Sequence, residues 1–153
     1  MPQTRYRYHV VRSKEDPSLA VWVPVIPVSL IYQGKRRTVG ALIDSGADLC
    51  LFHASIGRSL GIDVENGRLE LFKSLGPDTI PCYVHTVSLG LKGESNVDIE
   101  VGFMMSDFLA DGGLLGQKGF FDHFQVRFRR WENAIYIDRR RGQGKGAKIL
   151  GAI

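Results

Sequence analysis

The sequence contains little of what exported or membrane-bound proteins need. Only two of its 153 residues are cysteines, which is too few for a disulfide framework and is typical of a reducing compartment. No apolar run approaches the roughly 20 residues that cross a bilayer. The polar N-terminus also lacks the apolar segment of a secretory signal. These absences exclude a disulfide-stapled secreted domain, and we expect a cytoplasmic protein that does not bind membranes.

The composition is that of one globular domain rich in turns. Hydrophobic residues make up 44% and charged residues 24% of the chain, which argues against disorder. A chain of this length buries roughly two thirds of its unfolded surface and needs no staples to fold. The 18 glycines and six prolines suit short strands joined by turns better than a helical bundle.

The net charge of +4 comes from the end of the chain. Residues 139–153 hold five of the 20 basic residues and no acid, so the remainder has 15 basic residues against 16 acidic ones. Such a glycine-rich basic run is typical of a solvated tail, and nucleic-acid binding through it is the less favoured alternative. We therefore expect an N-terminal arm (1–19), a folded domain (20–138) and a basic tail (139–153).

Apolar runs with alternation predict about eight strands and one or two short helices. Residues 20–32 are apolar but are interrupted by Pro24 and Pro27, which predicts an edge strand, and the turn at Gln33–Gly34 leads into a strand over 37–43. Residues 54–60 suit a short helix that ends at Gly61. Later strands are predicted over 69–91, with a turn at Gly76, and over 97–104, 124–129 and 134–137. The fold class is therefore all-β.

The most informative segment is ALIDSGAD, residues 41–48. An apolar strand ends in a carboxylate, a hydroxyl and a glycine, which would hold the Asp44 side chain rigidly at the end of a sheet. Taken alone, Asp-Ser-Gly is a common turn, and the surrounding segments decide how it is interpreted.

Three ordered blocks of the chain resemble the retropepsin family, the single-domain aspartic proteases of retroviral type, and their bacterial relatives in particular. The blocks are the hairpin that carries ALIDSGAD, the hairpin centred on Gly76, and GLLG (113–116) followed by GFFDHFQVRF. They match the family's catalytic signature, its substrate-covering flap, and its apolar-apolar-Gly element with a short helix and final strand. The resemblance implies a closed acid-protease barrel that functions as a twofold homodimer.

The resemblance also implies roles for individual residues. Asp44, with Ser45 and Gly46, would be catalytic. Substrate binding would fall to loop and flap residues: Ala47, Asp48, Leu75, Gly76, Pro77, Asp78 and Thr79. Structural support of the loop would come from Leu114, Leu115 and Gly116. The substrate would be an extended polypeptide, and neither a cofactor nor a metal is implied.

Aspartic-protease chemistry needs two aspartates that share one proton. The chain has no second signature, because Asp111-Gly112-Gly113 lacks both the hydroxyl and the preceding strand. The second Asp44 would therefore come from another copy of the chain. The family's hydroxyl at the Ser45 position hydrogen-bonds across that twofold axis.

Two departures from the family pattern leave a second function open. Gln117 stands where retroviral members have the Arg that pairs with the second Asp of the signature, here Asp48, and the flap has only one glycine, Gly76. A catalytically silent dimerisation or peptide-binding module is therefore the alternative.

Two Cys-x-x-His pairs, residues 50–53 and 82–85, also raise the possibility of a zinc site. Positions i and i+3 of an extended strand face opposite sides, which makes convergence of the second pair on one ion unfavourable.

Overall fold

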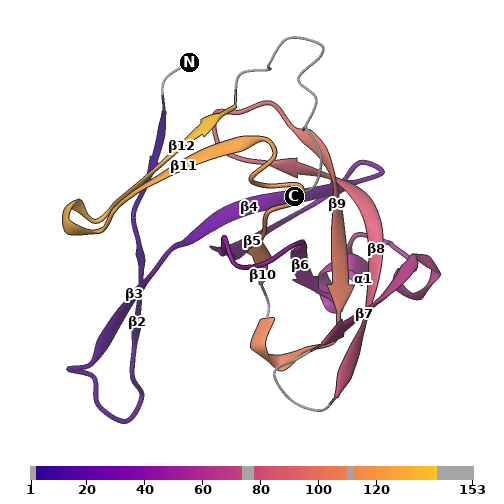
Figure 1. Cartoon of the computed structure of the whole chain (residues 1–153), viewed down its shortest axis with the longest axis horizontal. Helices are drawn as coiled ribbons and strands as arrows, with labels where there is room; N and C mark the ends of the chain where they lie inside the picture. Colours follow the sequence, from indigo (N-terminus) through magenta and orange to yellow (C-terminus); the bar gives the residue numbers. More distant parts are fainter. Residues whose placement is uncertain (1–2, 74–77, 110–111, 141–153) are drawn as a thin grey trace, which may run out of the picture.

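The computed structural model describes residues 3–73, 78–109 and 112–140, and within these the chain is mostly β (Figure 1). One short α-helix, α1 (Ala54–Ser59), and three 3-10 turns accompany the strands. None of the helices in these ranges is long and apolar enough to cross a membrane. The strands are β1 (Thr4–Tyr6), β2 (His9–Arg12), β3 (Ala20–Val23), β4 (Val25–Tyr32), β5 (Lys35–Ile43), β6 (Cys50–His53), β7 (Arg68–Lys73), β8 (Thr79–Gly90), β9 (Val97–Met104), β10 (Gly113–Leu115), β11 (Phe124–Arg129) and β12 (Ala134–Arg139).

Seven strands form the central sheet in the order β4-β5-β10-β6-β9-β8-β7. Residues 29–31 of β4 also pair with residues 88–90 of β8, so the sheet curls round and encloses apolar side chains. The largest fully buried side chains include Phe52, Phe103 and Phe120. Two smaller sheets complete the fold: β1-β12-β11 and the isolated pair β2-β3.

The first predicted hairpin is confirmed. Strands β4 and β5 pair antiparallel, and Gln33 and Gly34 join them with positive φ values of 46° and 81°, a turn that suits glycine. Pro24 separates β3 from β4. The strand predicted as an edge strand pairs with β5 and, over residues 29–31, also with β8. Pro24 and Pro27 both lie before residue 29, so neither interrupts the pairing with β8.

The predicted helix and the second hairpin are also present. Helix α1 is followed by Gly61, whose φ of 80° ends the helical conformation. Strands β7 and β8 pair from Arg68↔Val84 to Lys73↔Thr79. The predicted flap residues Leu75, Gly76 and Pro77 lie outside the described residues.

Two N-terminal strands were not predicted, and one local prediction is wrong. The polar N-terminal segment, for which the sequence predicted an arm and no strand, contains β1 and β2, and β1 pairs with β12 and buries Tyr6. Alternation of arginine and tyrosine hid this strand, because a tyrosine ring is apolar enough to face a core. The helix expected after Gly116 is a series of turns, because Gly119 adopts a φ of 98° and interrupts helical backbone.

Candidate active site

Strand β10 lies between the strand that leads into the Asp44 loop and the strand that leaves it. Gly113–Leu115 pairs parallel with Ala41–Ile43 of β5. On its other side, β10 pairs antiparallel with Leu51 and Phe52 of β6. Because both ends of the 44–49 loop flank one strand, the loop begins and ends on a rigid sheet.

Asp44 is the first residue after β5, and hydrogen bonds fix it from two sides. Its backbone N–H donates to the Leu115 carbonyl at 2.9 Å, and its own carbonyl accepts from Ala47 N at 3.1 Å. The Oδ1 atom accepts from Gly46 N at 2.9 Å. The carboxylate is half-buried, whereas Ser45 and Gly46 are exposed. The turn thus holds one carboxylate in a defined orientation at the protein surface.

The segment after β10 supports the loop from behind. Gln117 N donates to the Ala47 carbonyl at 2.8 Å, and Lys118 N donates to the Asp48 carbonyl at 2.9 Å. A Cβ atom at Gly116 would lie 2.2 Å from the Leu49 carbonyl oxygen, so only glycine allows this approach. Leu115 and Gly116 therefore contact the backbone of the loop directly.

The Gln117 side chain makes a contact that the sequence does not reveal. Its Nε2 donates to the Ser45 carbonyl oxygen at 2.7 Å, which ties the exposed tip of the loop to the supporting segment. The Asp48 carboxylate is exposed and has no side-chain partner among the described residues. Gln117 thus contacts the loop itself, at the residue after Asp44.

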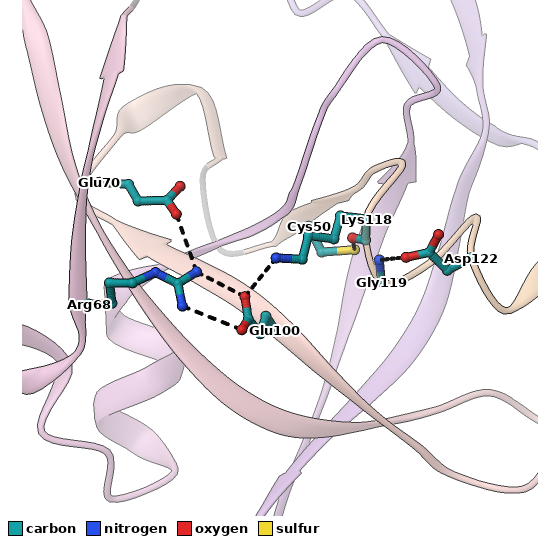
Figure 2. A network of polar contacts seen from close by, with 7 residues as sticks. All are labelled: Cys50, Arg68, Glu70, Glu100, Lys118, Gly119 and Asp122. Carbon is teal, nitrogen blue, oxygen red and sulfur yellow. Dashed lines mark hydrogen bonds and ion pairs between the residues drawn. The ribbon is translucent and has the colours of Figure 1, made fainter. Parts of the chain in front are cut away.

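An ionic cluster lies beside the supporting segment (Figure 2). Glu100 of β9 pairs with Arg68 of β7 and with Lys118, both at 2.9 Å, and Arg68 also pairs with Glu70 at 3.2 Å. The hydrogen bonds from Arg68 and Lys118 lower the pKa of Glu100 to about 2. This charge cluster, defined as these four residues, links the stem of the β7–β8 hairpin to the segment that supports the Asp44 loop.

Cys50 lies on the inner side of the same segment. Its sulfur accepts from Gly116 N at 3.4 Å and lies 3.6 Å from the Lys118 carbonyl, and burial raises the pKa of the thiol. Nearby, Gly119 N donates to Asp122 at 3.0 Å, as Figure 2 shows. A thiol kept neutral in this way is a packing group rather than a nucleophile.

A small apolar cluster occupies the space between the loop strands and the stem of the predicted flap. It joins side chains of β6, β8, β9 and β10. Leu114 belongs to its edge, whereas Leu115 is fully buried in the main core. Thr79 begins β8, and Asp78 directly precedes it. The members of the cluster are Leu51, Cys82, Met104 and Leu109, with Leu49, Ile80 and Leu114 packed against them.

The four candidate zinc ligands are engaged elsewhere. His53 caps α1 by accepting from Ser55 N at 3.1 Å, and the His85 ring nitrogen lies 2.8 Å from the Val64 carbonyl. Burial, with a smaller contribution from Glu70, raises the pKa of Cys82 to about 11. The described ranges contain no group of three or more His, Cys, Asp or Glu side chains placed to hold a metal. The geometry gives no support to a zinc site.

Comparison with known proteins identifies the fold. No protein-family model and no curated protein sequence matches the chain. Among solved structures, a retropepsin-like aspartic protease from Rickettsia conorii aligns with a TM-score of 0.57 and 12% identity, over 89% of this chain and 98% of the other. The retroviral protease-like domain of Ddi1 from Leishmania major aligns with a TM-score of 0.52 and 15% identity, over 78% and 94% of the two chains. With the strand-loop-strand arrangement around Asp44, these alignments show that the chain has a retropepsin-like fold.

Proposed function

We propose that the chain is an aspartic endopeptidase that acts as a twofold homodimer, with one Asp44 from each copy. The observation that carries the proposal is the Asp44 turn: within a retropepsin-like fold, a half-buried carboxylate at the end of β5 is oriented by Gly46 N at 2.9 Å. Each chain supplies one such carboxylate, and the reaction needs two.

The chemistry follows from placing two carboxylates side by side. Like charges at this distance do not both ionise, so the pair holds one proton. The ionised member takes a proton from a water molecule that attacks the scissile carbonyl, and the protonated member stabilises the oxyanion that develops. The Ser45 hydroxyl would hydrogen-bond across the axis and hold the two loops in register. No cofactor takes part.

The substrate in this proposal is an extended polypeptide. The predicted flap, Leu75 to Thr79, would close over the peptide, and the peptide backbone would add to the flap as a strand. Ala47 and Asp48 would hold the peptide backbone from the other side. The partly buried side chains Leu49, Ile80 and Leu114, which pack on the buried apolar cluster, would contact apolar side chains of the substrate.

A silent peptide-binding or dimerisation module remains the second candidate, and one observation favours it. The Asp48 carboxylate lacks a described side-chain partner, because Gln117 is directed to the Ser45 carbonyl instead. The two candidates differ in one measurable respect. An enzyme cleaves peptides and needs Asp44 to do so, whereas a silent module binds peptides or a second copy without cleaving peptides.

The test is cleavage of a diverse peptide library by the wild-type protein, Asp44→Asn and Asp63→Asn. Asp44→Asn is nearly isosteric, so the turn and the dimer should persist, while cleavage should fall by at least about 10²–10⁴-fold, the contribution of a general base. Asp63 is exposed and makes no side-chain cap bond to the following 3-10 turn, so its variant should cleave like the wild type. Equal cleavage by wild type and Asp44→Asn would remove the enzyme proposal, and cleavage by none of the three proteins would favour the silent module.

A further inference from the structure

The chain carries a two-stranded hairpin that stands apart from the body of the molecule. This N-terminal hairpin, residues 9–23, consists of β2 and β3, and its strands pair with each other and with no other described strand (Figure 1). An isolated two-stranded hairpin is only marginally stable in water. A hairpin of this kind needs further contacts to persist.

The hairpin exposes apolar side chains out of proportion to its length. Ten large hydrophobic residues are exposed in the described part of the chain, and four of them lie here: Val10, Val11, Leu19 and Val21. Val11 and Val21 are direct cross-strand partners, with 48% and 62% of their surface exposed. Since paired residues share one face of a hairpin, they form a bare apolar strip, the Val11–Val21 face.

The opposite face is partly covered, and this fixes the hairpin to the rest of the fold. Val10 pairs with Trp22, and the Arg130 guanidinium lies 4.8 Å from the centre of the Trp22 ring and 5.7 Å from that of Tyr8. Tyr8 N in turn donates to the Asn133 side chain at 3.0 Å. The turn between β11 and β12 therefore holds one face of the hairpin and leaves the Val11–Val21 face open.

The base of the hairpin lies beside the Asp44 loop. Strand β3 ends at Val23, and the carbonyl of the next residue, Pro24, accepts from Ile43 N at 2.9 Å, one residue before Asp44. If Asp44 of each copy meets across a twofold axis, the hairpin begins close to that axis. A segment that starts close to a twofold axis and extends away from its own body is placed to reach the other copy.

We infer that the Val11–Val21 face docks on a second copy of this chain, so that the N-terminal hairpin of each copy packs against the other copy. The inference rests on the proposed function, because the shared Asp44 pair places the axis. In a twofold dimer both hairpins would make this contact, so the buried apolar area would be twice that of one hairpin. The candidate active site would then be completed by the same contact that covers the hairpin.

The test compares sedimentation equilibrium of the wild-type protein, a Val11→Lys/Val21→Lys double variant and Leu71→Lys. Leu71, on β7, is a matched control because it is 67% exposed and lies outside the N-terminal hairpin. We expect a wild-type dimer, a dimer Kd raised at least about 100-fold in the double variant, and an unchanged Kd in the control. A milder pair, Val11→Ala/Val21→Ala, should raise the Kd by about tenfold without placing charge on the hairpin.

Circular dichroism and thermal unfolding establish that each variant is folded. A folded double variant that associates as tightly as the wild type would overturn the inference and leave the proposed function standing. A wild-type protein that stays monomeric would also overturn it. Failure of the proposed function would give a different result. The protein would still dimerise through the N-terminal hairpin, but Asp44→Asn would cleave peptides as well as the wild type.

Discussion

The Asp44 loop and the N-terminal hairpin are both exposed, but the chain holds them in opposite ways. The loop receives backbone hydrogen bonds from Leu115, Gln117 and Lys118, so its exposed polar groups sit on a fixed backbone. The hairpin strands bond to each other, and valines cover one of its faces. A polar surface on a backbone held by hydrogen bonds suits contact with a ligand, whereas an exposed apolar face on a hairpin held only from its other side suits burial by a partner.

The support of the loop also extends outward through charges. Lys118 joins the loop backbone to Glu100, and Glu100 joins Arg68 on the stem of the β7–β8 hairpin. The hairpin of residues 9–23 has no counterpart to this cluster among the described residues, because its one link to the β11–β12 turn is made through aromatic rings and Arg130. The supports of the loop can be removed one at a time without changing Asp44.

Among changes that remove the supports of the loop, the larger effect is expected from removing the Gln117 side-chain bond. Gln117→Leu leaves the Ser45 carbonyl without its donor at 2.7 Å, so the loop next to Asp44 loses its defined position. We expect kcat of peptide cleavage to fall about 10–100-fold with a smaller change in KM, because misplacing a reacting group costs chemistry more than binding. Stability should fall by only about 1 kcal/mol, the usual net value of one hydrogen bond.

The control for this variant is Gln125→Leu, the same change at an exposed position of β11. It should leave kcat and KM at their wild-type values. If Gln117→Leu also cleaved peptides at the wild-type kcat, the loop would be held without the Gln117 side chain.

A smaller effect, with a defined pH dependence, is expected at the charge cluster. The pKa of Glu100 is lowered from its usual 4.5 to about 2 in the folded protein, so its ion pairs stabilise the fold above pH 4.5 and this contribution is lost as the pH falls toward 2. Glu100→Gln should therefore lower the free energy of unfolding at pH 6 by about 0.5–1 kcal/mol, a small value because the partners are exposed. The difference from the wild type should disappear near pH 2.

Denaturant unfolding at pH 6 and near pH 2 measures this effect. Addition of salt to about 1 M should reduce the difference at pH 6, since the pairs are accessible to screening. Glu15→Gln, at an exposed position of the N-terminal hairpin, should show no such dependence. A Glu100→Gln difference that stays constant over this pH range would mean that the charge of Glu100 does not contribute to stability.

Much of the fold was predictable because its signals are local. The Gln33–Gly34 turn, the apolar run of β9 and the glycine after α1 each fix an element from neighbouring residues. The strand that ends at Asp44 was predictable for the same reason, since an apolar run stops abruptly at a carboxylate.

The contacts that support the site were not predictable, because they join distant positions through polar groups. Gln117 lies 72 residues from Ser45, and the sequence shows only that an Arg is missing there. Arg68 and Lys118 lie 32 and 18 residues from Glu100, and in a sequence they are ordinary surface charges. Strand β1 was missed because its pairing partner, β12, lies at the other end of the domain.

The most direct measurement of the central claim is the stoichiometry of a transition-state mimic. In a calorimetric titration at mildly acidic pH, a statine-type peptide places its hydroxyl where the attacking water would lie, between the two Asp44 carboxylates. We expect one inhibitor bound for every two chains and loss of this binding in Asp44→Asn. One inhibitor for every chain, or equal binding by wild type and Asp44→Asn, would contradict an active site shared by two copies.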